Sequence, residues 1–478
     1  MFSAEKRYWS ICLIATLGYT VLLFSWALFR HTSFRSEAFD LGIFDQALWL
    51  ISRGESPYSS LLQRHILGDH FSVILYPLAL FYKVYPSVYW LFFVQALSLS
   101  SGAPLLYLIS RKLTASDVNC GFVALAYLCH PILTNTNLYD FHPECLAVPL
   151  ILAAILFVLH DRVFLFLSFV LISIACKEVL SFTTVGIGLL LLTPALGRRA
   201  VVGGVTIILG VVCFLVISLI FIPVFNEGNS GAAGIERYGP PGLTITQLIF
   251  KYLCDPEFVL SRLHLLESLK YLYKLLLPYL FALSPGNFWV LVGAAPTFLL
   301  NCLSDLSLQR TIRFQYALPL MPFLGLLVAI AVGRNKLLYQ NKRHLGLALI
   351  AYLMIPIFGT LIKPSSTFPH PWKRWPNQHE SLKKAVLLIP PEGSVLAPSY
   401  VVPHLSHRRD VQMLRDPNPR WGLENYKFLL LNTRQPGWLV NKEKVVELVG
   451  LLTSSAYSKK ALLLYKEEDI YLFQFSAP

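Results

Sequence analysis

The sequence predicts a mainly α-helical protein that crosses a membrane many times and ends in a small α/β domain. Its 478 residues are 55% hydrophobic and only 14% charged, whereas a soluble domain carries about a quarter charged residues. Uncharged apolar runs of the roughly 20 residues that a membrane helix needs recur along most of the chain. The last segment instead alternates charged stretches with short apolar ones. This composition excludes a disordered chain, a collagen and a disulfide-rich scaffold, and it argues against an ordinary soluble enzyme.

The first apolar run, Tyr8 to Phe29, is a candidate membrane anchor. Lys6 and Arg7 precede it, and no cleavage site of small residues followed by a soluble chain comes after it. We therefore expect a retained helix and not a signal peptide. Because basic residues gather at the cytosolic ends of membrane helices, the N-terminus is expected in the cytoplasm. The predicted cytosolic ends carry eleven basic and three acidic residues, which is +8 of the chain's net charge of +13. No separate basic stripe with interleaved aromatic residues is found, so no nucleic acid partner is expected.

The stretch from His31 to Pro86 does not look like a membrane span. Its segment Phe39 to Trp49 is apolar on one helical face and acidic on the other, and the apolar piece His70 to Val84 is too short to cross. We expect two helices, at about 38–84, that lie along the outer membrane interface, as amphipathic helices do.

Ten further spans are expected, which gives about eleven crossings of the plasma membrane and an extracytoplasmic C-terminus. They lie near 87–110, 118–135, 144–160, 163–176, 179–196, 200–222, 271–284, 287–302, 314–333 and 344–362. The long loop 223–270 lies outside, is rich in Gly and Pro at its start, and is a candidate flap over a site.

The chain divides into a membrane domain, 1–363, and an extracytoplasmic α/β domain, 364–478. In the second domain, charged helical segments alternate with short apolar strands, a pattern typical of an α/β fold. The expected helices are 381–388 and 442–453, and the expected strands are 394–397, 426–431, 461–465 and 470–475.

Acidic side chains are scarce, and most of those near the membrane fall at the predicted outer ends of spans. Since ionisable groups at membrane depth usually face a cavity or a partner, their position predicts a single polar cleft that opens outward. The alternative is that each is a solvated loop residue near a helix end. The candidates are Asp40, Asp45, Asp69, Asp140, Glu144 and Glu178, together with His70 and His142.

Asp40 and Asp45 are a poor pair of cooperating carboxylates. Five residues correspond to roughly 140° of rotation on a helix, so the two do not share a face. We expect that one of them acts while the other caps or packs. Asp40 stands at the start of its helix and Asp69 shortly before the next, and helix capping is the alternative role for both.

The loop from Asp140 to Glu144 has the pattern D-x-H-x-E. Carboxylate and imidazole groups suit a divalent cation such as Mg, Mn or Zn, so Asp140, His142 and Glu144 are candidate ligands. Whether a divalent cation takes part stays open at this stage.

Three basic residues are candidates for holding a phosphate. Lys177 precedes Glu178 between two apolar runs, in either a tight outer turn or a buried ion pair, and its alternative role is to neutralise Glu178. Arg310 and Arg313 lie at the outer start of a span, where arginine also commonly snorkels. The sequence contains no Walker loop, GxSxG or HExxH motif, so ATP-driven transport and peptidase chemistry have no support.

Several of these segments together resemble the domain-of-unknown-function 2079 family of prokaryotic multi-pass membrane proteins. They occur in the family's order and span most of the chain. The matching segments are Phe39–Gln46, Gly68–Ser72, Tyr139–Glu144, Lys177–Glu178, Gln315–Tyr316 and Pro403–Arg408.

That family is similar to the GT-C glycosyltransferases, and the resemblance implies a GT-C-like fold and activity. Such enzymes use polyprenyl-phosphate-linked sugars and carry a catalytic acidic residue in the first outer loop, where Asp40 matches by position. The resemblance implies inverting transfer of a sugar from a lipid-linked donor to an acceptor hydroxyl on the outer face, with Asp40 as base. Lys177, Arg310 and Arg313 would stabilise the leaving phosphate, and the other candidates would line the site. The acceptor is not specified, and the absence of a DxD or ExD motif leaves metal dependence open.

Two other functions remain as alternatives. A transporter or flippase for a lipid-linked or acidic solute would have polar residues in the middle of several spans and an inverted repeat, neither of which is found. A non-catalytic scaffold would use the outer domain to bind a partner protein. We rank both below the glycosyltransferase.

Overall fold

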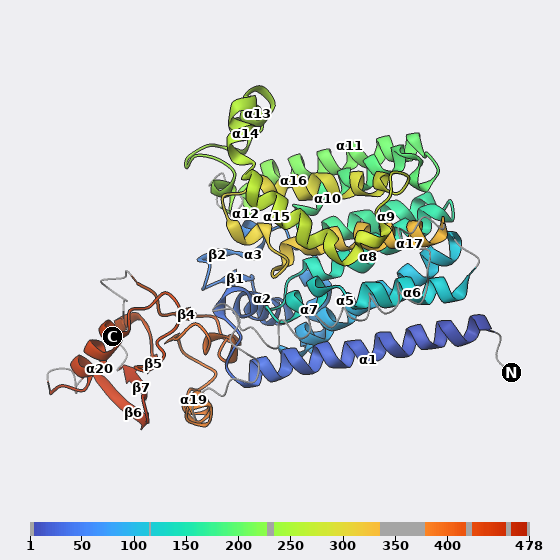
Figure 1. Ribbon diagram of the computed structural model, residues 1–478. Helices are drawn as coiled ribbons and strands as arrows, with labels where there is room; N and C mark the ends of the chain where they lie inside the picture. The colour runs from blue at the N-terminus through green and yellow to red at the C-terminus, as the bar shows by residue number, and fades with distance from the viewer. Residues whose placement is uncertain are drawn as a thin grey trace. The chain divides into compact units, whose positions relative to one another are not determined.

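The computed structural model describes residues 4–113, 116–226, 234–334, 378–416, 423–455 and 460–475 (Figure 1). The chain folds as two compact units. The first unit is made of Met1–Trp26, Leu67–Ile74 and Phe92–Ser365, and the second of Ala27–Ile66, Leu75–Leu91 and Ser366–Pro478. The second unit therefore contains the tail and most of the region, about 38–84, where interface helices were expected, whereas Leu67–Ile74 of that region belongs to the first unit.

Four helical stretches among the described residues are long and apolar enough to cross a membrane. They are α1 (Ala4–Thr32), α5 (Tyr89–Leu113), α11 (Ala200–Val216) extended by η3 (Ile217–Phe221) and α12 (Ile222–Phe225), and η8 (Gln315–Leu320) extended by α17 (Met321–Gly333).

These four stretches differ in what surrounds them. Within the most apolar 18 residues of each, 89% are buried in the α17 stretch, against 28% in the α1 and α11 stretches. A helix that is apolar all round and buried belongs to a core, so α17 forms the centre of the first unit. Exposed apolar side chains such as Leu17 on α1 and Val201 on α11 are what a lipid-facing helix presents.

Shorter helices match most of the remaining predicted spans, but prolines divide two of them. The span predicted near 118–135 ends at Leu128, and a new helix starts at Pro131, because proline cannot supply the hydrogen bond of a helix interior. The span near 271–284 becomes a 3-10 helix at Leu277–Ala282, where Pro278 lies. The span near 344–362 lies outside the described residues. The helices are α6 (Asp117–Leu128), α7 (Pro131–Asn137), α8 (Glu144–Leu159), α9 (Val163–Ile174), α10 (Leu180–Leu192), α15 (Leu265–Leu276) and α16 (Leu291–Leu303).

The outer loop predicted at 223–270 contains two helices of its own, α13 (Ile245–Cys254) and α14 (Pro256–Arg262). Thr244 and Gln247 form a reciprocal capping box at the start of α13, which satisfies two of the free backbone N–H groups of a helix N-terminus. A short 3-10 turn, η4 (Ile235–Arg237), precedes them.

Helix α10 packs against both α11 and α16, and Figure 1 shows the three helices side by side. A Cβ atom at Gly186 would overlap the carbonyl oxygen of Gly293 on α16. Small residues permit such close backbone approach in membrane helices. This packing fixes α10 and, with it, the short connection from α9 that carries Lys177 and Glu178.

The second unit contains a five-stranded mixed sheet in the order β4-β3-β5-β7-β6 (Figure 1). Strand β3 pairs in parallel with β4 and β5, whereas β7 is antiparallel to β5 and β6. Helix α19 (Gln378–Leu387) packs on β7 and α20 (Lys442–Leu452) on β5. The strands are β3 (Val395–Ala397), β4 (Val411–Met413), β5 (Phe428–Asn432), β6 (Ala461–Glu467) and β7 (Ile470–Phe475).

The same unit contains the two helices expected from the first outer loop, α2 (Ile43–Ser52) and α4 (Leu75–Val84), which pack against each other. A π-helical turn, η1 (Ala38–Gly42), leads into α2. A hairpin of two-residue strands, β1 (Tyr58–Ser59) and β2 (Arg64–His65), follows it.

Candidate functional site

The first unit contains a partly open cavity of about 380 Å³. Most of its wall is apolar, supplied by side chains such as Phe182 on α10, Phe214 on α11 and Leu248 on α13. Polar groups line the rest, among them His70, Glu144, Lys177, Glu178, Arg237 and Gln315. Ligand sites combine such apolar walls with a few placed polar groups, so this cavity is the candidate site of the first unit.

A buried ion pair between Lys177 and Glu144 stands in the cavity wall. Lys177 Nζ donates to Glu144 Oε1 at 2.7 Å, and the two residues are 7% and 3% exposed. Burial alone would lower the pKa of Lys177, but the carboxylates of Glu144 and Glu178 raise it above its ordinary value, so the amine is charged. The connection between α9 and α10 was expected to hold a tight turn or a buried ion pair, and it holds a turn whose lysine pairs with a residue on α8.

Glu178 holds the segment Leu67–Ile74 against this connection. Its Oε1 lies 2.7 Å from His70 Nδ1, and its Oε2 accepts the backbone N–H of Phe71 at 2.9 Å. Burial raises the pKa of Glu178, but His70 and Lys177 outweigh it and lower the pKa to about 2. The Glu178 carboxylate is therefore charged near neutral pH and holds His70 at the cavity.

Three cavity residues that were not predicted as site residues from the sequence complete the polar wall. Arg237 Nη1 donates to the Tyr316 hydroxyl at 3.5 Å, and Asn301 Nδ2 donates to the Tyr316 carbonyl oxygen at 3.0 Å. Arg237 is the last residue of η4, in a stretch of loop that is rich in Gly and Pro. A single arginine in such a stretch is the sequence feature that could have indicated a site residue. Tyr316 belongs to a segment singled out only for its family resemblance.

Arg310 and Arg313, expected at the site, are not among the described residues that line the cavity. Arg310 is buried and donates through Nη1 to the carbonyl oxygen of Ser304, so its guanidinium closes a local turn. Arg313 is exposed. Asp69 is the last residue of α3 (Ile66–Asp69), and α4 starts only at Leu75. Asp69 therefore does not cap α4, which was the alternative role considered for it.

Asp140 and His142 are buried, with 3% and 1% exposure. His142 donates its backbone N–H to Gln95 Oε1 at 3.2 Å, and its Nδ1 lies 3.1 Å from the Asp140 carbonyl oxygen. Within the described part of the chain, no group of three or more His, Cys, Asp or Glu side chains is arranged to hold a metal ion. Since Glu144 pairs with Lys177, the predicted cation ligand set of Asp140, His142 and Glu144 is not assembled there.

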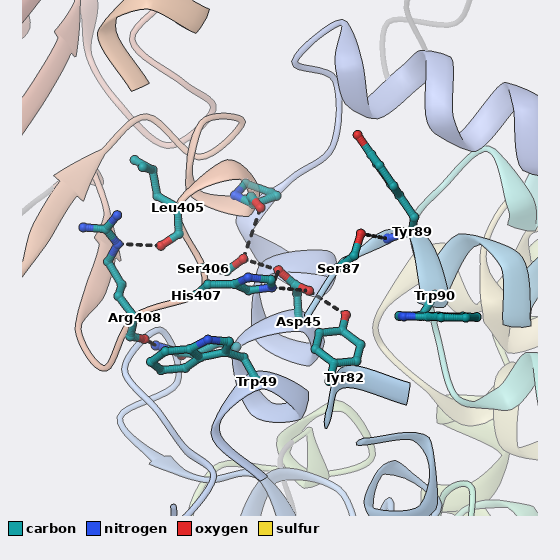
Figure 2. Close-up of polar contacts among 12 residues, drawn as sticks. Asp45, Trp49, Tyr82, Ser87, Tyr89, Trp90, Leu405, Ser406, His407 and Arg408 are labelled. Carbon is teal, nitrogen blue, oxygen red and sulfur yellow. Dashed lines mark hydrogen bonds and ion pairs between the residues drawn. The ribbon is translucent and has the colours of Figure 1, made fainter. Parts of the chain in front are cut away.

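A second polar cluster lies in the second unit around Asp45, which is 1% exposed (Figure 2). Its carboxylate accepts hydrogen bonds from the Tyr82 hydroxyl at 2.6 Å and from the Ser406 hydroxyl, and His407 Nε2 lies 3.1 Å away. Burial raises the pKa of Asp45, but His407 and the hydroxyl donors lower it below its ordinary value. Both carboxylate oxygens of Asp45 are thus hydrogen-bonded to other side chains of the protein.

Gln46, the next residue, reinforces this connection. Its side-chain amide donates to the Ser60 hydroxyl at 2.8 Å and to the Arg408 carbonyl oxygen at 3.1 Å. Ser60 in turn donates to the Val411 carbonyl oxygen at 2.8 Å. Helix α2 and the tail segment Pro403–Arg408 are therefore held together by a buried hydrogen-bond network within the second unit.

Asp40 lies in η1, just ahead of α2, and is half-buried. The N-cap of α2 is Gly42, without a side-chain cap, so Asp40 does not cap α2 as the alternative interpretation held. Asp40 and Asp45 belong to the second unit, and the other predicted site residues belong to the first.

These features define a membrane protein with several apolar helices, a cavity with a buried ion pair and a small C-terminal α/β region. The chain belongs to the family described as predicted membrane protein (DUF2079), whose model matches residues 30–462. No curated protein matches the sequence.

Two solved structures share this fold. They are crystal structures of ArnT from Cupriavidus metallidurans, one bound to undecaprenyl phosphate and one in the apo state. Each has a TM-score of 0.56 and 11% sequence identity, and each match covers 96% of this chain and 97% of ArnT. The likeness confirms the predicted GT-C-like helical membrane fold with a small C-terminal α/β region.

Proposed function

We propose that this protein is an integral membrane glycosyltransferase that transfers a sugar from a polyprenyl-phosphate-linked donor to an acceptor hydroxyl. The observation that carries the proposal is the cavity of the first unit, which combines apolar walls with Lys177 and Arg237. An apolar wall suits a polyprenyl chain, and charged donors suit a phosphate oxygen. The fold shared with ArnT, which has been crystallised with undecaprenyl phosphate, supports a lipid phosphate as ligand.

Lys177 and Arg237 are the proposed phosphate ligands, and Arg237 takes the role expected of Arg310 and Arg313. The lysine ammonium has three donors, of which Glu144 uses one. Arginine presents a planar fork of donors that matches phosphate geometry. Both cations would stabilise the negative charge that develops on the phosphate as the glycosidic bond breaks.

Asp40 is the proposed general base. Its carboxylate takes the proton of the acceptor hydroxyl while that oxygen forms a bond to the anomeric carbon. The bond between the anomeric carbon and the phosphate oxygen breaks with its electron pair, so the lipid phosphate leaves and the configuration inverts. The position of Asp40 in the first outer loop, matched to the catalytic acid of GT-C enzymes, supports this role.

The lipid-phosphate site can be tested by binding. In nanodiscs, we expect undecaprenyl phosphate to bind the full-length protein, and Lys177→Met and Arg237→Met each to weaken binding about tenfold or more, because each removes a charged hydrogen bond. Arg313→Met is the matched control, since Arg313 is exposed and does not line the cavity. Equal effects of all three substitutions would argue against this site.

Transfer itself can be tested at Asp40. Asp40→Asn should abolish sugar transfer from a radiolabelled polyprenyl-phosphate sugar while leaving abundance, membrane insertion and lipid binding unchanged, because the amide cannot take the proton. Full activity of the variant would remove Asp40 from the mechanism. Movement of the donor across vesicles without any transfer would favour a flippase.

A further inference from the structure

Two buried acceptor atoms, on residues that line the cavity of the first unit, have no hydrogen-bond partner among the described residues. They are Oε2 of Glu144 and Oε1 of Gln315, which belong to residues only 3% and 5% exposed. Both residues line the cavity. Buried polar atoms in native proteins are nearly always hydrogen-bonded, so these two atoms call for a hydrogen-bond donor that the described residues do not supply.

The fold presents these two residues from adjacent elements. Glu144 is the first residue of α8, Gln315 is the first residue of η8, and the two helices pack against each other. Lys177 holds the other carboxylate oxygen of Glu144 at 2.7 Å. The ion pair therefore fixes the side chain that carries the open oxygen.

Two parts of a lipid-linked sugar cannot be the hydrogen-bond partners of these unpartnered oxygen atoms. A carboxylate oxygen and an amide oxygen only accept hydrogen bonds. An ionised phosphodiester also only accepts, and a polyprenyl chain has no polar hydrogen, so neither can satisfy them. In a lipid-linked sugar, the hydroxyl groups of the sugar can donate hydrogen bonds to these two oxygen atoms.

We propose that the cavity contains a sugar subsite in which Glu144 Oε2 and Gln315 Oε1 accept hydrogen bonds from hydroxyl groups of the donor sugar. This inference rests on the proposed function and deepens it. Lys177 and Arg237 then bind the phosphate, while Glu144 and Gln315 distinguish the sugar-bearing lipid from the bare lipid phosphate. Acceptors left without donors disfavour a ligand that lacks the matching hydroxyl groups.

Gln315→Leu tests the subsite with the full-length protein in nanodiscs. The probes are undecaprenyl phosphate and a panel of the same lipid carrying glucose, galactose, mannose or arabinose. The wild type should bind at least one sugar-bearing lipid more tightly than the bare lipid. In the variant, that affinity should fall about tenfold through loss of a hydrogen bond to the sugar, with the affinity for bare lipid unchanged. Gln315→Glu keeps an acceptor and should retain the preference.

A matched control uses the hydroxyls of Thr183 and Thr297, which line the same cavity but lie 2.9 Å from each other and so satisfy each other. The double variant Thr183→Val/Thr297→Val should change neither affinity. Gln315→Leu weakening both lipids equally, or neither, would overturn the subsite while leaving the lipid-phosphate site in place. A wild type that binds neither lipid would overturn the proposed function and the subsite together.

Discussion

Lys177 shows how a single buried charge organises the site of the first unit. Its ammonium is paired with Glu144 at 2.7 Å, and Glu178 beside it is occupied by His70 and the backbone of Phe71. Removing one partner of a buried pair leaves an uncompensated charge, which is strongly destabilising. The sequence singled out all four side chains, because charged residues between apolar runs are rare. It did not indicate that Lys177 pairs with Glu144, since 33 positions separate them.

The Asp45–His407 pair makes a pH-dependent contribution to the stability of the second unit. Although burial opposes it, Asp45 raises the pKa of His407 above its ordinary value. The stabilisation from His407 is then fully present below the unfolded pKa of about 6.5 and is lost as the pH rises through the higher folded pKa. The pKa of Asp45 is lowered in the folded protein. The stability that Asp45 contributes is therefore present above its unfolded pKa of about 3.9 and is lost as the pH falls through its lower folded pKa.

We therefore expect His407→Gln to lower the free energy of unfolding by about 1.5–3 kcal/mol near pH 5.5, the contribution of a hydrogen bond to a charged group, and by less as the pH rises. Thermal unfolding of the wild type and the variant between about pH 5 and 8.5 measures this difference across the range that brackets the histidine pKa. Arg409→Gln is the control, because Arg409 forms a largely exposed ion pair with Glu55 and exposed pairs contribute little. A pH-independent difference for His407→Gln would contradict the role of the charge.

Among the helices and strands, the local sequence pattern predicted those elements that have a distinctive length and composition. The structure confirms strands in the segments expected at 394–397, 426–431, 461–465 and 470–475. They were predictable because each is a run of apolar residues bounded by turn signals. Strand β4 was missed, since its three residues, Val411 to Met413, follow two arginines and an aspartate and are too short to show a period.

Breaks and contacts within the helical part depend on information that a hydropathy pattern does not carry. The apolar run 118–135 continues across Pro131, yet the helix divides there. Gly186 looks like any small residue in an apolar run, and only the structure shows that α16 approaches it too closely for a side chain. Such long-range packing decides where the ends of α10 lie, and so where Lys177 lies.

At the scale of the whole molecule, composition was sufficient for the class of protein but not for how distant segments associate. A mainly helical membrane protein with a C-terminal α/β region followed from the 55% hydrophobic content and the change of pattern in the tail. The association of α2 and α4 with the tail in one unit did not. Asp45 and His407 are 362 positions apart, and no local period links residues at that separation.

Orientation across the membrane is a prediction for the whole molecule, and Cys254 provides the probe. The charge distribution predicts that the region after α12 faces outward, and Cys254, at the end of α13, is an exposed free cysteine. A membrane-impermeant maleimide should label the protein in intact cells, and Cys254→Ser should remove most of that label. The other seven cysteines are fully or partly buried and serve as the internal control. Labelling of Cys254 only after the membrane is opened from the cytoplasmic side would reverse the orientation, and with it the proposal that transfer takes place on the outer face.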